Sequence, residues 1–191
     1  MIPIEFEATF QNINVADLRN KLEGIGAAQV HEEQLLSRVA FNLPTIDSNA
    51  FVRVRNEFGK ITMTYKSIKG DTIDGQKEVE LDIDNFENGI VFLRALGCNE
   101  KAYQETKRET WKTGNGVMVT IDTWPFLETF VEIEGENELD VRTISEELGF
   151  KWVNAIFDGV TLQYANKYHI TKERINDHTP KIMFDMENPF L

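Results

Sequence analysis

Two glutamates one residue apart, Glu5 and Glu7, lie near the amino terminus in the stretch IEFEATF. Alternate side chains of a strand point to opposite faces, so in a strand both carboxylates would share one face while Phe6 lies on the other. Clustered carboxylates are the ligands that hard divalent cations such as Mg²⁺ and Mn²⁺ prefer. The question that this pattern raises is whether the acidic face meets only water or lines a cavity.

Basic side chains recur with the same spacing in other segments. Arg53 and Arg55 share one face of FVRVRNE, Lys66 lies in the following ITMTYKS, and Arg108 belongs to YQETKRETW. Guanidinium and ammonium groups in such positions suit phosphate oxygens, which accept charge-assisted hydrogen bonds. A polyphosphate bridged to metal ions would therefore engage both the basic and the acidic positions.

Further carboxylates follow in the second half of the chain. Asp122 lies in VTIDTW, and Glu132 and Glu134 share one face of FVEIEG. On an open sheet each of these faces would simply be solvated. The combined pattern is more informative, because the basic residues come from central segments whereas the carboxylates come from the first and last ones.

Composition narrows the class of protein. The 191 residues are 41% hydrophobic and carry a net charge of -12, which fits one globular domain and argues against general nucleic-acid binding. No apolar run is long enough to cross a bilayer, and the amino terminus lacks the order of a signal peptide, so we expect a cytoplasmic protein. Cys98 is the only cysteine and the three histidines are scattered, which excludes a Cys/His zinc cluster.

Segments with a period of two dominate the chain. They predict strands at about 2–10, 34–42, 50–58, 60–68, 76–84, 102–112, 116–123 and 128–135. The links NEFGK and KTGNG are typical of hairpin turns. Eight antiparallel strands commonly close into a barrel, whose interior would then hold charges of both signs. Buried charges are costly unless paired or ligated, so such a barrel is expected to bind a ligand.

Amphipathic helices interrupt the strands. One begins after Asn14, others are predicted at about 85–96 and 140–148, and each of these three ends in a glycine that favours a left-handed cap. A fourth is predicted at about 156–168, beginning near Asp158. We expect residues 1–169 to form one domain and residues 170–191 to form a tail, in which Ile182, Phe184 and Met186 add a short strand or dock on the barrel or a partner.

Together these segments resemble the CYTH superfamily of triphosphate tunnel enzymes, which includes class IV adenylyl cyclases, thiamine triphosphatases and inorganic triphosphatases. The resemblance rests on IEFEATF, FVRVR, TMTYK, KEVEL, KRETW, TIDTWPFLETFVEIEG and FDGVTLQYANKY, and it covers about residues 2–168. It implies an α+β fold, an eight-stranded antiparallel tunnel with flanking helices, in which inward basic residues hold phosphates and inward carboxylates hold metal.

The resemblance also assigns roles to individual positions. Those expected to hold the substrate phosphates are Arg38, Arg53, Arg55, Lys66 and Arg108. The metal is assigned to Glu5, Glu7, Asp122, Glu132 and Glu134, and catalytic roles to Glu5, Glu7, Glu78 and Glu80. Thr9 and Thr106 stand where family members commonly carry lysine, and the adjacent Lys107 is expected to point out of the tunnel.

The expected activity depends on one or two bound Mg²⁺ or Mn²⁺ ions. Hydrolysis of tripolyphosphate, thiamine triphosphate or a nucleoside triphosphate such as ATP needs the fewest special contacts. Conversion of ATP to cyclic AMP and pyrophosphate would use the same cradle, with the ribose 3′ hydroxyl as the attacking group. A binding module that holds a nucleotide or polyphosphate without turnover is the third alternative, and a homodimer is possible in each case.

Overall fold

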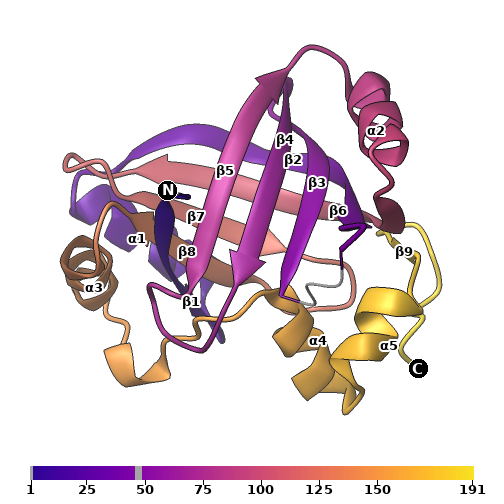
Figure 1. The fold of residues 1–191 in the computed structure, drawn as a ribbon. Coiled ribbons are helices and arrows are strands. Elements are labelled where there is room, and N and C mark those ends of the chain that lie inside the picture. Colours follow the sequence, from indigo (N-terminus) through magenta and orange to yellow (C-terminus); the bar gives the residue numbers. More distant parts are fainter. Residues whose placement is uncertain (1, 46–48) are drawn as a thin grey trace.

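The computed structural model describes residues 2–45 and 49–191. Helices follow the first, fifth and eighth strands, and the remaining helices lie near the carboxyl terminus (Figure 1). The strands are β1 (Ile4–Phe10), β2 (Ala28–Asn42), β3 (Ala50–Glu57), β4 (Lys60–Ile68), β5 (Gln76–Ile83), β6 (Asn99–Lys112), β7 (Met118–Thr123), β8 (Phe130–Gly135) and β9 (Lys181–Ile182). The helices are α1 (Val15–Gly24), α2 (Phe86–Ala95), α3 (Glu138–Glu147), a 3₁₀ turn (Trp152–Asn154), α4 (Val160–Tyr168) and α5 (Lys172–Asp177).

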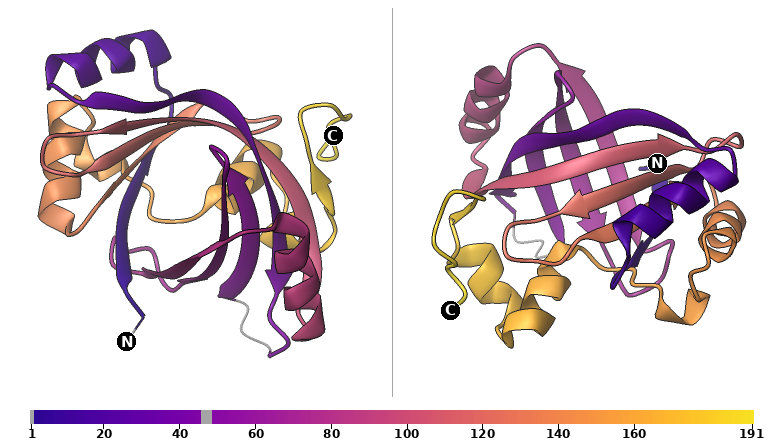
Figure 2. Two further views of the ribbon diagram at one scale, coloured as in Figure 1. Left: turned by 90° about the horizontal axis from the view of Figure 1, so that it is seen from above. Right: turned by 180° about the vertical axis from the view of Figure 1, so that it is seen from behind.

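The first eight strands form a closed antiparallel barrel. Their order is β2-β3-β4-β5-β1-β8-β7-β6, and β6 pairs with β2 again, which closes the sheet. The short β9 adds to β6 in parallel. Figure 2 shows the strands arranged in a ring, with α1, α2 and α3 on its outer side. The predicted α+β fold, an eight-stranded barrel with flanking helices, is confirmed.

Helices α1 and α2 begin close to where the sequence predicts, whereas α3 begins at Glu138, about two residues earlier than predicted. Asn14, Asn85 and Asn137 accept a hydrogen bond from a backbone N–H of the first turn of α1, α2 and α3. Just beyond these helices, Gly26 and Gly149 adopt positive φ, where a side chain would be strained. The caps set where each helix starts and stops. After α1 and α2 the chain enters the next barrel strand, β2 or β6.

The apolar core lies outside the barrel rather than within it. Ala8 and Phe10 point outward from β1 and pack with Leu18 and Leu22 of α1 and Val141 of α3. A second cluster places α2 against β2 and β3, and a third joins α4, α5 and the tail to β7 and β8. Because the helices cover the apolar outer faces of the strands, the inward faces are left to polar residues.

Some elements differ from those predicted. β2 begins at Ala28 rather than near residue 34, because its first half is held by pairing with β6 despite its polar sequence. The helix predicted at 156–168 begins only at Val160, since Ile156 forms a backbone bridge with Thr9. Helix α5 was not predicted. Phe184 and Met186 lie beyond β9, which ends at Ile182.

Residues 170–191 contact the barrel along much of their length. Ile182 and Phe190 are buried with Tyr164 and Trp124. The backbone N–H of Phe184 donates to the Glu105 carboxylate at 3.0 Å. Within the described part of the chain, no helix is long and apolar enough to cross a membrane.

Candidate active site

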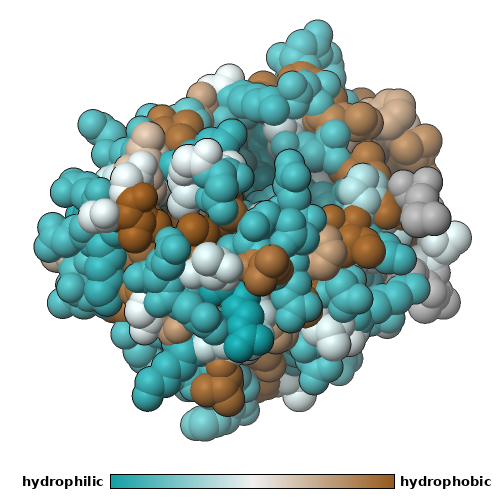
Figure 3. Space-filling model, turned by 90° about the vertical axis from the view of Figure 1, so that its left-hand side faces the viewer, coloured by the Kyte–Doolittle hydropathy of each residue, from teal (hydrophilic) through white to brown (hydrophobic). Residues whose placement is uncertain are grey.

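The barrel encloses a cavity of about 690 Å³ that receives side chains from all eight of its strands. Every site residue predicted from the sequence except Asp122 lines it. Figure 3 shows a recess bordered by hydrophilic residues on the face nearest α1 and α3. The acidic face of β1 therefore looks into this cavity, which answers the question that Glu5 and Glu7 raised.

The two signs of charge divide the barrel wall between them. The predicted phosphate-binding residues come from four consecutive strands of the closed barrel, β6, β2, β3 and β4, and they are Arg108, Arg38, Arg53, Arg55 and Lys66. The predicted carboxylates come from the other four, β5, β1, β8 and β7, and they are Glu78, Glu80, Glu5, Glu7, Glu132, Glu134 and Asp122. A basic wall thus faces an acidic wall across the cavity.

The basic wall carries positive charge that its neighbours only partly neutralise. Burial lowers the pKa of Arg38 well below its ordinary value, and the cations of Arg53, Arg55 and Arg108 lower it further. Arg38 donates to Gln104 at 2.8 Å and lies 4.4 Å above the Trp124 ring, and it forms no ion pair with any residue that the structure describes. An anion in the cavity would relieve this repulsion.

Three carboxylates of the acidic wall meet at one point. One carboxylate oxygen from each of Glu5, Glu7 and Glu134 lies within 4.8 Å of the others. Burial raises the pKa of Glu5 to about 7 despite the opposing effect of Lys66, and the Glu7 carboxylate adds to the rise. Glu7 is buried, Glu5 is half-buried and Glu134 is exposed. A divalent cation would offset the repulsion among these close carboxylates, so the donor set fits Mg²⁺ or Mn²⁺.

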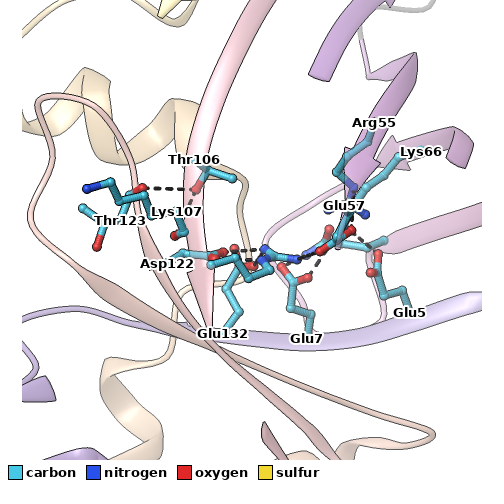
Figure 4. Close-up of polar contacts among 12 residues, drawn as sticks. Glu5, Glu7, Arg55, Glu57, Lys66, Thr106, Lys107, Asp122, Thr123 and Glu132 are labelled. Atoms are coloured by element: carbon cyan, nitrogen blue, oxygen red, sulfur yellow. Dashed lines mark hydrogen bonds and ion pairs between the residues drawn. The ribbon is translucent and has the colours of Figure 1, made fainter. Parts of the chain in front are cut away.

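Lys66 bridges the two walls. Its ammonium nitrogen lies 2.7 Å from Glu5 Oε2, 3.7 Å from Glu7 Oε2 and 3.5 Å from Glu78 Oε2 (Figure 4). Burial opposes its charge, but Glu7, Glu5 and Glu78 together raise the pKa of Lys66 above its ordinary value. Lys66 is therefore a fixed cation beside the carboxylate cluster.

Arg108 organises a second group of carboxylates. Its Nε donates to Asp122 Oδ1 at 2.7 Å, its Nη2 donates to Glu132 Oε2 at 2.9 Å, and its Nη1 lies 3.5 Å from Glu57 Oε1. Asp122 is fully buried, and burial together with the charges of Glu7 and Asp122 raises the pKa of Glu132. Asp122 and Glu132 thus contact Arg108, whereas the cluster of three carboxylates is formed without them.

Glu78 and Glu80 lie beside the arginines of β3. Arg53 contacts Glu78 at 3.4 Å and Arg55 contacts Glu80 at 3.5 Å, while Thr64 donates to Glu80 at 3.1 Å. Burial opposes ionisation of Glu78, but Arg53 and Lys66 hold its pKa below the ordinary value. Glu78 is therefore held in its ionised form beside Arg53 and Lys66.

The positions where lysine was expected are buried threonines that do not line the cavity. Thr9 is 1% exposed, and Thr106 donates from Oγ1 to the Thr123 carbonyl oxygen at 3.2 Å. Lys107 points away from the cavity, as predicted, with its ammonium 5.1 Å from the Phe184 ring centroid. Figure 4 shows Lys107 beside Thr123, apart from the cluster around Lys66. The cradle is thus built from Arg38, Arg53, Arg55, Lys66 and Arg108.

Sequence reasoning missed several residues that line the cavity. Glu57 contacts both Arg55, at 2.9 Å, and Arg108. Trp124 faces Arg38, and His31 stacks on Phe58 with 3.9 Å between ring centroids. The only local signal was Phe58 itself, an aromatic residue in the turn NEFGK where hairpins favour asparagine or glycine.

A closed barrel with a basic wall opposite an acidic one defines a class of protein that binds anionic, metal-chelating ligands in a tunnel. Comparison with known families agrees with this architecture. The CYTH domain matches residues 10–154, and the chain belongs to the CYTH family of triphosphate tunnel proteins. Members of this family are triphosphatases or adenylyl cyclases and use divalent metals.

Solved structures share the fold. The PH1012 protein from Pyrococcus horikoshii OT3 is 25% identical with a TM-score of 0.69, over 82% of this chain and 96% of that one. A protein from Vibrio parahaemolyticus provisionally named an adenylate cyclase is 14% identical with a TM-score of 0.65, over 81% of this chain and 94% of that one. No curated protein sequence matches the chain significantly.

Proposed function

We propose that this protein is a divalent-metal-dependent hydrolase of triphosphates. The observation that carries the proposal is the division of one cavity lining into a mainly basic side, on β6, β2, β3 and β4, and an acidic side, on β5, β1 and β8. A triphosphate that chelates a divalent cation presents anionic phosphate oxygens on one side and the bound cation on the other. It therefore complements both walls at once.

In this proposal the basic wall binds and orients the substrate. Arg53, Arg55 and Arg108 hold the phosphate oxygens and stabilise the charge that spreads over them as the phosphoryl group transfers. Arg38 extends the same wall, and Lys66 holds oxygens near the carboxylates. Glu57, Glu78 and Glu80 keep the guanidinium groups in place before the substrate arrives.

The acidic wall holds the metal. Glu5, Glu7 and Glu134 are the proposed ligands, because their oxygens converge, and Glu132 lies beside them with Arg108 as its partner. A bound divalent cation would supply charge neutralisation at the phosphates and lower the pKa of a coordinated water. Asp122 acts on the substrate only through Arg108, whose orientation it fixes.

A product analysis tests the proposal. Purified protein with Mg²⁺ or Mn²⁺ is offered tripolyphosphate, thiamine triphosphate and ATP in parallel, and orthophosphate, pyrophosphate and cyclic AMP are quantified. Orthophosphate release supports hydrolysis, whereas cyclic AMP with equimolar pyrophosphate would identify a cyclase. Binding of a substrate without any product would identify a binding module.

The double variant Glu7→Gln with Glu132→Gln ties the activity to this site. It removes two carboxylates of the acidic wall while keeping side-chain volume, so metal-dependent turnover should be lost and the far-UV circular dichroism spectrum should be kept. Its control is Glu87→Gln with Glu138→Gln, two exposed carboxylates in the first turns of α2 and α3. Full activity in the Glu7/Glu132 variant would contradict the proposed site.

A further inference from the structure

One end of the cavity carries a pair of stacked aromatic rings that the phosphate site does not use. His31 of β2 and Phe58 of the β3–β4 turn lie 3.9 Å apart between ring centroids with an angle of 10° between their planes, and both line the cavity. Both are only half-buried. Figure 1 shows this turn at the end of the barrel away from α4 and α5.

Two local irregularities of the backbone aim these rings at the cavity. Phe58 has a φ of 51°, in the left-handed region that a bulky residue rarely adopts, within a two-residue turn between the paired Glu57 and Lys60. The β2–β6 register shifts on both sides of His31. Bulges re-aim side chains and are frequent beside functional sites, as is strained backbone.

Unpartnered hydroxyls accompany the rings. Thr62 is 2% exposed and Thr110 is 5% exposed, and both line the cavity. Neither Oγ1 atom has a hydrogen-bond partner among the described residues. Thr110 is paired with His31 in the sheet register, and Thr62 follows the β3–β4 turn on β4. Buried hydroxyls without partners are free to bond the polar edge of a ligand.

The rings lie directly beyond the basic wall. Glu57, the residue before Phe58, contacts Arg55 at 2.9 Å and Arg108 at 3.5 Å. A phosphate chain held by these arginines would thus direct whatever is attached to its end toward His31 and Phe58. A flat ring can stack on aromatic side chains, and the threonine hydroxyls can bond its edge.

We infer that this mouth of the tunnel is a subsite for the heteroaromatic group of an organic triphosphate, with the base of a nucleoside triphosphate as the fitting ligand. The inference rests on the proposed function, because it assigns the preferred substrate class of the same site. The His31–Phe58 pair determines specificity, whereas the phosphates are held by the residues already described.

The test compares ATP with inorganic tripolyphosphate, which shares the phosphates and lacks the ring. Phe58→Leu keeps an apolar side chain and the same backbone strain but removes the flat face. We expect kcat/KM for ATP to fall about tenfold, mainly through KM, while that for tripolyphosphate stays within about twofold. Phe58→Tyr keeps the ring and should retain both activities. His31→Leu provides a second variant if Phe58→Leu does not fold.

An equal loss for both substrates, or no loss for ATP, would overturn the inference. If the unaltered protein turned over neither compound, the hydrolase proposal would fail. The subsite would then be tested by calorimetry, with the ratio of the dissociation constants for ATP and tripolyphosphate in place of the ratio of their kcat/KM values. An unchanged ratio in Phe58→Leu, or no binding of ATP to the unaltered protein, would overturn the inference by that route as well.

Discussion

The Arg108 guanidinium donates its Nε hydrogen to Asp122 Oδ1 over 2.7 Å, and Asp122 has no exposed surface. Because the carboxylate is sealed behind the arginine, it neutralises and orients Arg108 from the side opposite the cavity. Asp122 is absent from the cavity lining for the same reason. The Arg108 guanidinium is therefore held in one orientation, in which it can contact a substrate in the cavity.

The first prediction concerns this pair. Asp122→Asn should lower the free energy of unfolding by about 3 kcal/mol, because removing one partner leaves the other charge buried without full compensation. Urea denaturation at pH 7 measures the change. Asp82→Asn is the matched control, since Asp82 pairs with Lys60 on the surface and such pairs contribute about 0–1 kcal/mol. Equal effects of the two substitutions would contradict the account of Arg108.

The second prediction concerns the carboxylate cluster. Glu134→Gln should weaken binding of Mn²⁺ at least about tenfold, because it removes one of three converging oxygen donors. Calorimetry with Mn²⁺ alone measures the affinity. Glu136→Gln changes the same charge two residues away, outside the cluster, and should change the affinity far less. If both variants lost affinity equally, the cluster would attract cations only through net charge.

The third prediction concerns pH. Burial opposes ionisation of Glu57, but Arg55, Arg108 and Arg53 hold its pKa below the ordinary value of 4.5. A carboxyl whose pKa is depressed in the folded state stabilises the fold above its unfolded pKa, and that contribution is lost as the pH falls through the folded pKa. Glu57→Gln should therefore cost about 2 kcal/mol at pH 7, and the difference should shrink below about pH 4.5.

Urea denaturation of both proteins at several pH values between 7 and 3 measures this difference. Glu138→Gln, an exposed carboxylate on α3, should stay within about 0.5 kcal/mol of the unaltered protein throughout. A Glu57→Gln difference that stayed constant down to pH 3 would show that the ionised carboxylate does not stabilise the fold through the arginines.

The strands and their inward faces could be predicted from the sequence. Apolar and polar residues alternate along a strand wherever its outer face is apolar and covered by a helix. Phe6, Ala8 and Phe10 alternate with Glu5, Glu7 and Thr9 for this reason. The first half of β2 gave no such signal. It is held by pairing with β6 through an irregular register, so its strand character depends on a partner far away in the chain.

The division of the site into two groups could not be predicted. Asp122, Glu132 and Glu134 carry the same charge and lie on the same side of the barrel, but only the three-dimensional register places Asp122 and Glu132 on Arg108 and leaves Glu134 with Glu5 and Glu7. The stacking of His31 on Phe58 joins β2 to the β3–β4 turn, two segments that are distant in the sequence. No local pattern records such a contact.

The last prediction links the carboxyl-terminal residues to the cavity. Phe190 is 6% exposed and lies 4.8 Å from Tyr164 and 5.2 Å from Tyr168 between ring centroids. Trp124 belongs to the same apolar cluster and lies over Arg38 in the cavity. Tyr164 also packs edge-on against Trp124, with 6.5 Å between ring centroids. Phe190→Ala should therefore lower the free energy of unfolding by about 3–5 kcal/mol and weaken binding of tripolyphosphate, because Tyr164 would no longer hold Trp124 firmly against Arg38.

Urea denaturation and calorimetry measure the two effects separately. Leu191→Ala is the matched control, because Leu191 is the adjacent residue and is 93% exposed, so its truncation removes almost no buried surface. A loss of stability in Phe190→Ala without any loss of affinity would show that the tail stabilises the barrel but does not support Arg38. A loss of both, absent from Leu191→Ala, would make the last residues of the chain part of the phosphate-binding structure.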